Sequence, residues 1–406
     1  MLAERYDEHQ LRKALRASAP IELMPRLRNR SRWGSLPDGV KRYCLDKAER
    51  RLGAEWPALP ATLFMEYVRD GNRIRYEERS IPRRHAVVEL VIAECIENDG
   101  RFLDEIINGI WALCEESYWG VPAHVKRPLP DPANPIFDLF SGETSSVLAW
   151  TIRIMGPELD AIDPTVTKRV KREIRTRIMD PYLDSMFHWM GFDGRRVNNW
   201  NPWCNWNALT AFILLEDDEE RRVKAVDKAL RSLDQYLRSL PGDGGCDEGP
   251  GYWGYAGGSL FECLDLLYLA TDGAIDYFDL PRIREIGQYI VRTHIHEDYF
   301  VNYADGTAKL DGSAHWTLNP ATVYRYGVRI GDGDLCALGA DAMRRRGVRS
   351  LENNRVSSPY RIIPGLFLYE EICEYAGPSQ TIAEMWLQDT QVMAARSGDD
   401  TGSGLY

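Results

Sequence analysis

The sequence predicts an all-α domain built from antiparallel helical hairpins. Apolar residues recur at helical spacing through most of the chain, and short turns separate the helical segments. One such turn at 98–100, Asn-Asp-Gly, joins helices expected at 82–98 and 102–117. No convincing run of strands precedes residue 381, and no repeat of fixed period occurs in the sequence, which disfavours tetratricopeptide-like arrays.

The expected helices follow one another at short intervals. The first is amphipathic and lies at 5–17, and Ser35 with Pro37 marks the start of the second, which runs to about Leu52. The remaining helices are expected at 82–98, 102–117, 142–156, 163–179, 181–189, 206–215, 218–239, 257–271, 281–295, 320–330, 332–345 and 361–375.

Three segments lack the helical pattern. The stretch EYVRDGNRIRYEER, within 56–79, alternates enough to predict a short hairpin or an extended loop around Asp70-Gly71. Residues 118–140 are rich in proline and aromatic residues, and loops of this length inside a compact domain are usually functional or flexible. The last stretch, QDTQVMAARSGDDTGSGLY, predicts a strand, a turn and the beginning of a second strand.

The composition narrows the class of protein. The 406 residues carry a net charge of -11, which argues against a nucleic-acid partner, because such domains usually present a basic face to phosphate. No stretch of about 18 apolar residues occurs, so we expect no membrane partner. The N-terminus lacks an apolar run fit for a secretory signal. We therefore expect a cytoplasmic protein as the chain stands, or a periplasmic or secreted one if a signal has been removed.

The cysteines stand singly along the chain. None of them has the close spacing of a zinc site, and most lie in apolar helical patterns where a free thiol acts as a small hydrophobe. We therefore expect reduced core cysteines, and neither a metal nor a cofactor. The eight positions are Cys44, Cys95, Cys114, Cys204, Cys246, Cys263, Cys336 and Cys373.

A glycine-rich stretch at 243–255, DGGCDEGPGYWGY, differs most from the helical background. Its glycines permit backbone conformations that a side chain would forbid, so the segment can fold tightly and expose Tyr252 and Tyr255 at the start of the next helix. A plain turn covered by aromatic packing explains the same residues equally well.

A second unusual stretch, NNWNPWCNWN at 198–207, interleaves asparagines with tryptophans. Trp200, Trp203 and Trp206 recur at spacing three, which makes an aromatic wall on one face of a short helix. Aromatic faces with amide donors and acceptors suit a sugar ring, because the rings stack on its apolar face and the amides bind its hydroxyls. The alternative is a helix core, in which five asparagines would need buried partners.

Together these motifs resemble the N-terminal half of the heparinase II/III-like polysaccharide lyases. The resemblance is clearest over about 56–305, and it rests on NNWNPW, DGGCDEGPGYWGYAGG, YFVNYADGTAK at 299–309, PAH at 122–124, DLFSGET at 138–144, and the run from GNRIRYEERS at 71 to CEESYW at 119. It implies an incomplete (α/α) toroid over 1–380. It also implies that 381–406 begin a truncated C-terminal β-sandwich domain, with the substrate between the two.

The resemblance also implies a reaction, β-elimination at a uronic acid of an acidic polysaccharide or oligosaccharide. A catalyst must then neutralise the carboxylate, accept the proton from C5 and protonate the leaving oxygen. By position, Tyr252 matches the catalytic tyrosine, as general acid and as a candidate base. Asn198 and Asn199 match the pair that neutralises the carboxylate, with Asn199 standing where a histidine would be a possible proton acceptor.

Other residues of the two stretches and their surroundings are expected to bind substrate: Trp200, Trp203, Asn201, Trp253, Tyr255, Glu248, His124 and Arg196. The histidine motif of the β-domain is absent from the chain. We therefore expect this chain to supply the toroid half of the site, to have weak or no lyase activity alone, and to need the missing β-domain as a partner.

The remaining candidates are weaker. His188 could line the site, although a histidine packed at a helix end explains it better; His294 and His296 lack a third metal ligand, and His315 is left without a role. The local cations are Arg79, Arg83, Arg84, Arg195 and Arg196, and solvated arginines explain any one of them equally well.

Two other functions fit the sequence. A glycoside hydrolase on an (α/α) barrel would draw its acid and base from Asp243, Asp247, Glu248 and Asp305, but it leaves the tyrosine and the asparagines without a role. A non-catalytic glycan-binding helical domain would bind saccharide without turnover.

Overall fold

The protein is mostly helical in a computed structural model that describes residues 1–16, 21–312, 318–353, 355–377 and 384–398. This confirms the all-α class. The first part of the chain forms α1 Leu2–Arg5, α2 Glu8–Arg16, α3 Arg30–Gly34, α4 Asp38–Glu49, α5 Ala61–Asp70, α6 Ile74–Glu97, α7 Leu103–Cys114, α8 Leu139–Ile162, α9 Thr165–Ile174, α10 Asp180–Asp184, α11 Trp200–Leu215 and α12 Glu219–Ser239.

The second part forms α13 Gly257–Ala270, α14 Pro281–Arg292, α15 Pro320–Ile330, α16 Gly333–Arg346, α17 Pro359–Phe367 and α18 Tyr369–Glu374. Two antiparallel pairs of strands accompany them: β1 His294–His296 with β2 Tyr299–Phe300, and β3 Glu384–Leu387 with β4 Val392–Ala395. Short helical turns lie at Pro122–His124, Arg175–Met179, His188–Met190, Pro250–Tyr252 and Val348–Leu351.

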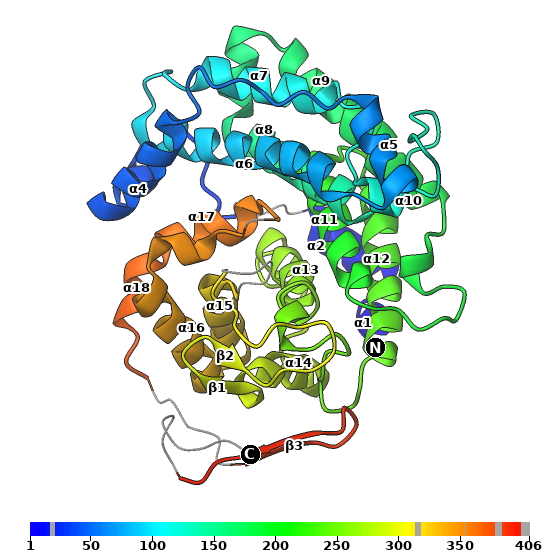
Figure 1. Ribbon diagram of the computed structural model, residues 1–406, viewed down its shortest axis with the longest axis vertical. Coiled ribbons are helices and arrows are strands. Elements are labelled where there is room, and N and C mark those ends of the chain that lie inside the picture. Colours follow the sequence, from blue (N-terminus) through cyan, green and yellow to red (C-terminus); the bar gives the residue numbers. More distant parts are fainter. Residues whose placement is uncertain (17–20, 313–317, 354, 378–383, 399–406) are drawn as a thin grey trace.

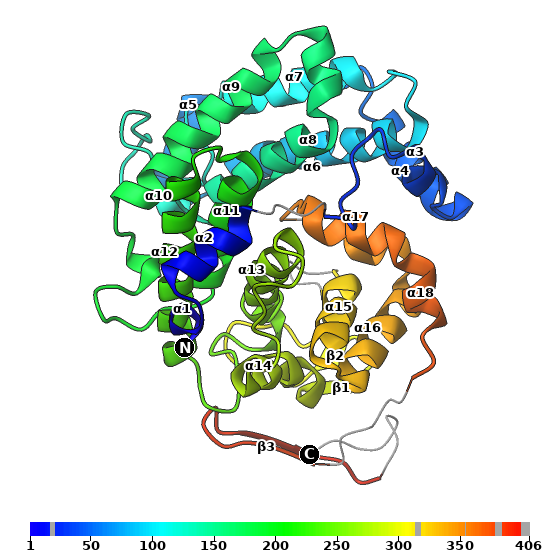
Figure 2. The same ribbon diagram turned by 180° about the vertical axis from the view of Figure 1, so that it is seen from behind.

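Consecutive helices pack as pairs, and the pairs follow an arc (Figure 1). The helices α6 and α7 contact each other, as do α8 and α9, α11 and α12, and α15 and α16. In this arc α7 and α9 lie outside α6 and α8, α11 contacts both α8 and α13, and α17 returns to contact α8. Seen from behind, α1 and α2 lie against α12 (Figure 2). The arrangement brings the start of α11 close to segments far away in sequence.

One helix dominates the interior. Helix α11 buries residues on all its sides, including Asn201, Asn205 and Asn207, which are fully buried. The Asn205 amide group bonds to the Asn201 carbonyl, the Ser232 hydroxyl and the Tyr182 hydroxyl, whereas the buried Oδ1 atom of Asn207 has no hydrogen-bond partner among the described residues. The helix starts at Trp200, six positions before the predicted start.

The hairpin or extended loop predicted within 56–79 is wrong. Helix α5 ends at Gly71, whose φ of 79° lies in the left-handed region, and α6 begins three residues later. Phe64 and Tyr76 bury their rings together in an edge-to-face contact at 5.1 Å, and this packing holds both helices. Helix α6 continues through Pro82. The alternation in this stretch is therefore one face of two helices.

Other boundaries also differ. Backbone extended at Ser185 ends α10, so the helix predicted over 181–189 stops early. Helix α14 ends at Arg292, and β1 occupies the end of the helix predicted over 281–295. The predicted first strand of the C-terminal stretch coincides with β4, but its partner β3 lies upstream. The predicted second strand falls in 399–406, outside the described residues, as does His315.

The described cysteines are free thiols, and all but Cys373 are buried, which confirms them as core residues. Within the described residues, no helix is long and apolar enough to cross a membrane.

Candidate functional site

The glycine-rich stretch packs tightly on two neighbouring segments. Gly249 has a φ of 89°, and a Cβ atom there would lie 2.5 Å from the Tyr303 carbonyl oxygen. Gly244 also has a positive φ, and a Cβ atom there would clash with the backbone of Glu285 in α14. Both positions therefore need glycine, because its missing side chain allows the close approach. The loop then enters the short helix Pro250–Tyr252 ahead of α13.

Asp243 joins this loop to the C-terminal hairpin. Its carboxylate accepts hydrogen bonds from the backbone N–H groups of Asp389 at 2.8 Å and Thr390 at 2.9 Å, and from the Thr390 hydroxyl at 2.8 Å. In return the Asp389 carboxylate accepts the Gly242 N–H at 2.6 Å. Burial alone would raise the pKa of Asp243, but the bonds from Thr390 and Gly245 hold it below its usual value. Asp243 therefore has a structural role in the described chain.

The loop meets the start of α11 through one polar contact. Asn199 is buried, and its side-chain amide donates to the Glu248 carboxylate. Asn198 is less buried, and its side-chain oxygen accepts the Trp200 N–H at 3.2 Å. The structure thus brings Asn199 into contact with the loop that carries Glu248 and Tyr252.

At Glu248 and Tyr252, burial and neighbouring carboxylates outweigh the groups that lower the pKa. Burial, together with the charges of Asp247 and Asp305, raises the pKa of Glu248 to about 7, and the Asn199 bond only partly opposes this shift. Burial and the charges of Glu248 and Asp305 raise the pKa of Tyr252 to about 12, against a smaller lowering by Arg355. Tyr252 is therefore protonated near neutral pH, so it suits a proton donor and not a base.

Several predicted contact residues lie behind this surface. The Trp203 ring stacks on Tyr255 at 4.3 Å, and its indole N–H donates to the Glu143 carboxylate at 2.5 Å. The Tyr255 hydroxyl accepts the Asn353 side-chain amide at 2.6 Å. All three rings or carboxylates are buried, with Trp203 6% exposed and Tyr255 2% exposed. They support the shape of the site from inside.

Two further residues that were predicted to bind substrate lie in the core. Trp253 is 1% exposed and donates its indole N–H to the Ile286 carbonyl at 2.8 Å. Asn201 is fully buried, and its amide donates to the Trp189 carbonyl and to the Ser232 carbonyl and hydroxyl. Their spacing in the sequence resembles a binding surface, but in the described structure neither side chain reaches a surface that a ligand could contact.

His124 lies beside Trp200. Its Nδ1 atom is 2.6 Å from the Asp138 carboxylate, and its ring centroid is 4.5 Å from the Trp200 ring. The ring of His188 also lies near this indole, with its centroid 5.6 Å from that of Trp200. The loop over 118–140 thus delivers a histidine to the start of α11, and Trp200 is the most exposed of the stretch's three tryptophans.

The arginines divide into two groups. Arg83 and Arg84 are buried and pair with Glu116, so they are structural. Arg79 and Arg195 are exposed, and Arg196 lies 3.6 Å from Asp247 across an open surface. The cation that acts on Tyr252 is Arg355, which also pairs with Glu77 at 3.1 Å.

Sequence reasoning missed four residues of this region: Asp138, Glu143, Asn353 and Arg355. The first two lie in the DLFSGET motif, which could have been inspected for carboxylates. No local signal marks Asn353 or Arg355, because they reach the cluster from a segment about 100 positions away in sequence.

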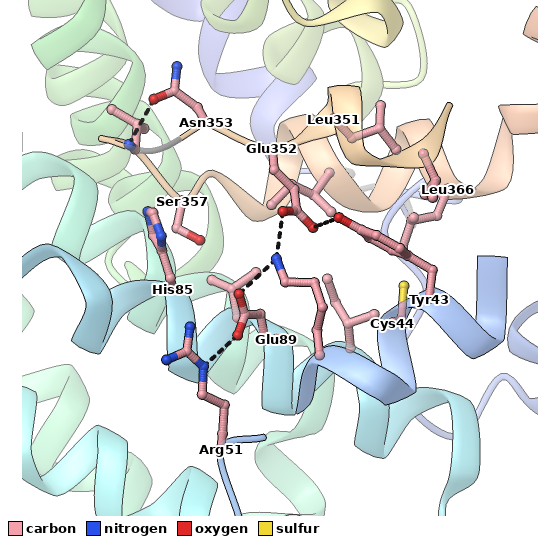
Figure 3. Close-up of a pocket in the computed structure, with 16 residues that line it drawn as sticks. Tyr43, Cys44, Arg51, His85, Glu89, Leu351, Glu352, Asn353, Ser357 and Leu366 are labelled. Atoms are coloured by element: carbon pink, nitrogen blue, oxygen red, sulfur yellow. Dashed lines mark hydrogen bonds and ion pairs between the residues drawn. The ribbon is translucent and has the colours of Figure 1, made fainter. Parts of the chain in front are cut away.

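A separate pocket of about 250 Å³ lies between α4, α6 and the segment before α17 (Figure 3). Glu352 accepts from the Tyr43 hydroxyl at 3.0 Å and pairs with Lys47 at 2.5 Å. Glu89 pairs with Lys47 at 2.9 Å and with Arg51 at 2.7 Å. Asn353 lines the same pocket and so links it to Tyr255.

One group in the pocket has no partner. Burial lowers the pKa of His85 to about 4, and its buried Nε2 atom has no hydrogen-bond partner within the described structure. Among the described residues, no group of three or more histidine, cysteine, aspartate or glutamate side chains could hold a metal ion.

Comparison with known proteins assigns no relative. No protein-family model matches the sequence, and no curated protein matches it.

Proposed function

We propose that the chain is the toroid half of a lyase that cleaves uronic-acid-containing glycans by β-elimination. The observation that carries this proposal is the contact of the two unusual stretches, in which Asn199 reaches Glu248 and the same loop presents a protonated Tyr252. The arc of helical hairpins in Figure 1 supports an incomplete (α/α) toroid of the heparinase II/III-like kind. A downstream β-domain is proposed as the partner that completes the site.

Tyr252 is the general acid in this proposal. A hydroxyl with a pKa of about 12 carries its proton at neutral pH and can pass it to the oxygen that leaves C4. The neighbouring carboxylates keep it protonated, which disfavours Tyr252 as the base.

Glu248 and the asparagines receive the substrate carboxylate. A uronate that approaches Glu248 adds another like charge, so it raises the pKa of Glu248 above about 7 and favours its protonated form. A protonated Glu248 donates a hydrogen bond, and the Asn199 amide that it no longer needs can turn to the substrate. Substrate binding is therefore accompanied by proton uptake. Arg196 and Arg355 add positive charge at the edge of the cluster.

A glycoside hydrolase remains the second candidate because of one observation. A carboxyl group with a pKa of about 7 is suited to general acid catalysis of glycoside hydrolysis, and Glu248 has it. Glu143 also has a pKa raised to about 7 by burial, but it lies behind Trp203. A non-catalytic glycan-binding domain would use the same surface without turnover.

The reaction product distinguishes these functions. The chain, and the longest natural form of the protein that contains it, would be incubated with heparan, chondroitin, alginate and bacterial exopolysaccharides. Elimination leaves an unsaturated, ultraviolet-absorbing sugar end, whereas hydrolysis leaves a new reducing end without that absorbance. Unsaturated product from any of these glycans supports the lyase. Reducing ends alone would establish the hydrolase, and binding without either product would leave only the glycan-binding domain.

A further inference from the structure

The loop histidine His124 is oriented by a buried carboxylate. Asp138 lies at the start of α8, where one of its oxygens accepts the Ser141 N–H at 2.8 Å and the other accepts the Tyr118 hydroxyl at 3.0 Å. Burial alone would raise the pKa of Asp138, but the bonds from His124 and Ser141 hold it below its usual value. An ionised carboxylate only accepts, so the proton between them sits on Nδ1 of His124, 2.6 Å away.

In its neutral form, an imidazole with this tautomer has a lone pair on Nε2. The imidazole is held between Phe140, at a ring distance of 5.8 Å, and Trp200, at 4.5 Å. The His124 side chain is 12% exposed, and within the described residues its Nε2 atom has no hydrogen-bond partner. A fixed ring with an unshared, accessible nitrogen is what a general base requires.

The His124 ring contacts a residue at the edge of the proposed site. Trp200 is the residue directly after Asn199, which holds Glu248, and Tyr252 follows Glu248 by four positions in the same loop. We propose that His124, oriented by Asp138, removes the C5 proton in the elimination. This inference rests on the proposed function. It gives the chain its own proton acceptor, although Asn199 stands where a histidine would have supplied one.

The proposed step is balanced. Nε2 of His124 takes the proton from C5, and the C–H electron pair becomes the second bond between C4 and C5. The C4–O bond breaks, and its oxygen takes the proton of the Tyr252 hydroxyl. His124 is left protonated and Tyr252 ionised, and a proton returns from one to the other through solvent before the next turnover.

His188 provides a matched control. It contacts the ring of the same Trp200 at 5.6 Å, but no described carboxylate accepts a hydrogen bond from it. Burial lowers the pKa of His188, so it is a neutral imidazole near neutral pH. A histidine that merely packs against Trp200 should behave alike at both positions.

The test compares variants on whichever glycan the protein cleaves to unsaturated product. We expect His124→Gln to lower kcat by about 10²–10⁴ with KM changed less than about 3-fold, and His188→Gln to change both by less than about 3-fold. In Asp138→Asn the side-chain oxygen can still accept the Ser141 N–H and cap α8, which turns the NH2 group toward Nδ1 of His124 in place of an acceptor, so kcat should fall by at least about 10-fold. Circular dichroism and thermal unfolding confirm that each variant is folded.

A rescue experiment separates chemistry from packing. Added imidazole should restore turnover to His124→Gly and leave Tyr252→Phe inactive. Equal losses in the His124 and His188 variants, or retained kcat in His124→Gln, would overturn the base assignment while the lyase function stands. If the wild-type protein releases no unsaturated product from any glycan, the proposed function fails, and the role of His124 fails with it.

Discussion

The pocket in Figure 3 and the cluster around Glu248 are both polar, but they shift the pKa of their carboxyl groups in opposite directions. In the pocket, Glu89 and Glu352 each pair with a cation, and the charges and hydrogen bonds of Arg51 and Lys47 outweigh burial and hold the pKa of Glu89 below its usual value. In the cluster, burial and neighbouring carboxylates raise the pKa of Glu248 to about 7. Charges that satisfy each other stabilise the fold, whereas a carboxyl group whose pKa is raised by burial and like charges marks a candidate functional site.

Removing one hydroxyl from each region should give the largest contrast. Tyr252→Phe should lower turnover of a cleaved glycan by about 10²–10⁴, because the general acid is lost, with little change in stability. Tyr43→Phe should leave turnover within about 2-fold and lower the free energy of unfolding by about 1 kcal/mol, because the Glu352 carboxylate loses a donor. Steady-state kinetics and urea unfolding on both variants measure the contrast. Full activity in Tyr252→Phe would remove Tyr252 from the chemistry.

Neutralising Glu89 should destabilise the protein. Glu89→Gln leaves Lys47 and Arg51 with one fewer anion in a half-buried pocket, so we expect a loss of about 1–3 kcal/mol at pH 7. Since the folded pKa of Glu89 lies below its ordinary value of 4.5, this stability is present above pH 4.5 and is lost as the pH falls through the folded pKa. The control Glu49→Gln breaks an exposed pair with Arg101 and should cost less than about 0.5 kcal/mol.

Neutralising Glu248 should raise the free energy of unfolding, in contrast to Glu89. Its folded pKa of about 7 lies above the ordinary value of 4.5, so the folded state loses stability as the pH rises from 4.5 through 7. Glu248→Gln removes that loss, and we expect a gain on the order of 1 kcal/mol at pH 8 that disappears at pH 4.5, after a discount for its partial exposure. Chemical unfolding at both pH values tests this. A variant less stable than wild type at pH 8 would show that Glu248 is compensated after all.

The smallest effect is expected at the rim. Arg196 and Asp247 are 3.6 Å apart, with side chains 60% and 35% exposed, so Arg196→Gln should change stability by less than about 0.5 kcal/mol. Its positive charge should matter more for an anionic ligand, and affinity for an acidic glycan should fall about 2–3-fold at low salt and not at high salt. Isothermal titration of wild type and variant with the glycan at two salt concentrations measures this difference in affinity. A loss that persists at high salt would indicate a direct contact and not long-range attraction.

The sequence predicted the helical class and singled out two stretches that contact each other in the fold, because helical periodicity and a dense cluster of glycines and aromatic residues are local signals. It could not separate the tryptophans and asparagines that face the site from those that face the core. Asn199 and Asn201 are two positions apart in the same motif, yet one reaches Glu248 and the other is fully buried. That difference depends on which helices surround α11.

Site residues that come from distant parts of the sequence could not be predicted for the same reason. Asn353 and Arg355 precede α17 and meet the loop of Tyr252 only because the arc returns α17 to α8. The prediction for 56–79 was wrong for a different reason. A short window of sequence shows only the alternation, whereas the edge-to-face contact of Phe64 and Tyr76, twelve positions apart, favours two helices.

The Asp243 contact bears on the order in which the molecule assembles. It ties the glycine loop to Asp389 and Thr390, which are 146 and 147 positions further along. The contact therefore cannot form until the turn between β3 and β4 has been synthesised and has docked. The hairpins of the arc need only near neighbours and can form earlier. The loop that carries Glu248 and Tyr252 therefore acquires its final shape late in folding, and under mild denaturant we expect its amide hydrogens to exchange before those of α11.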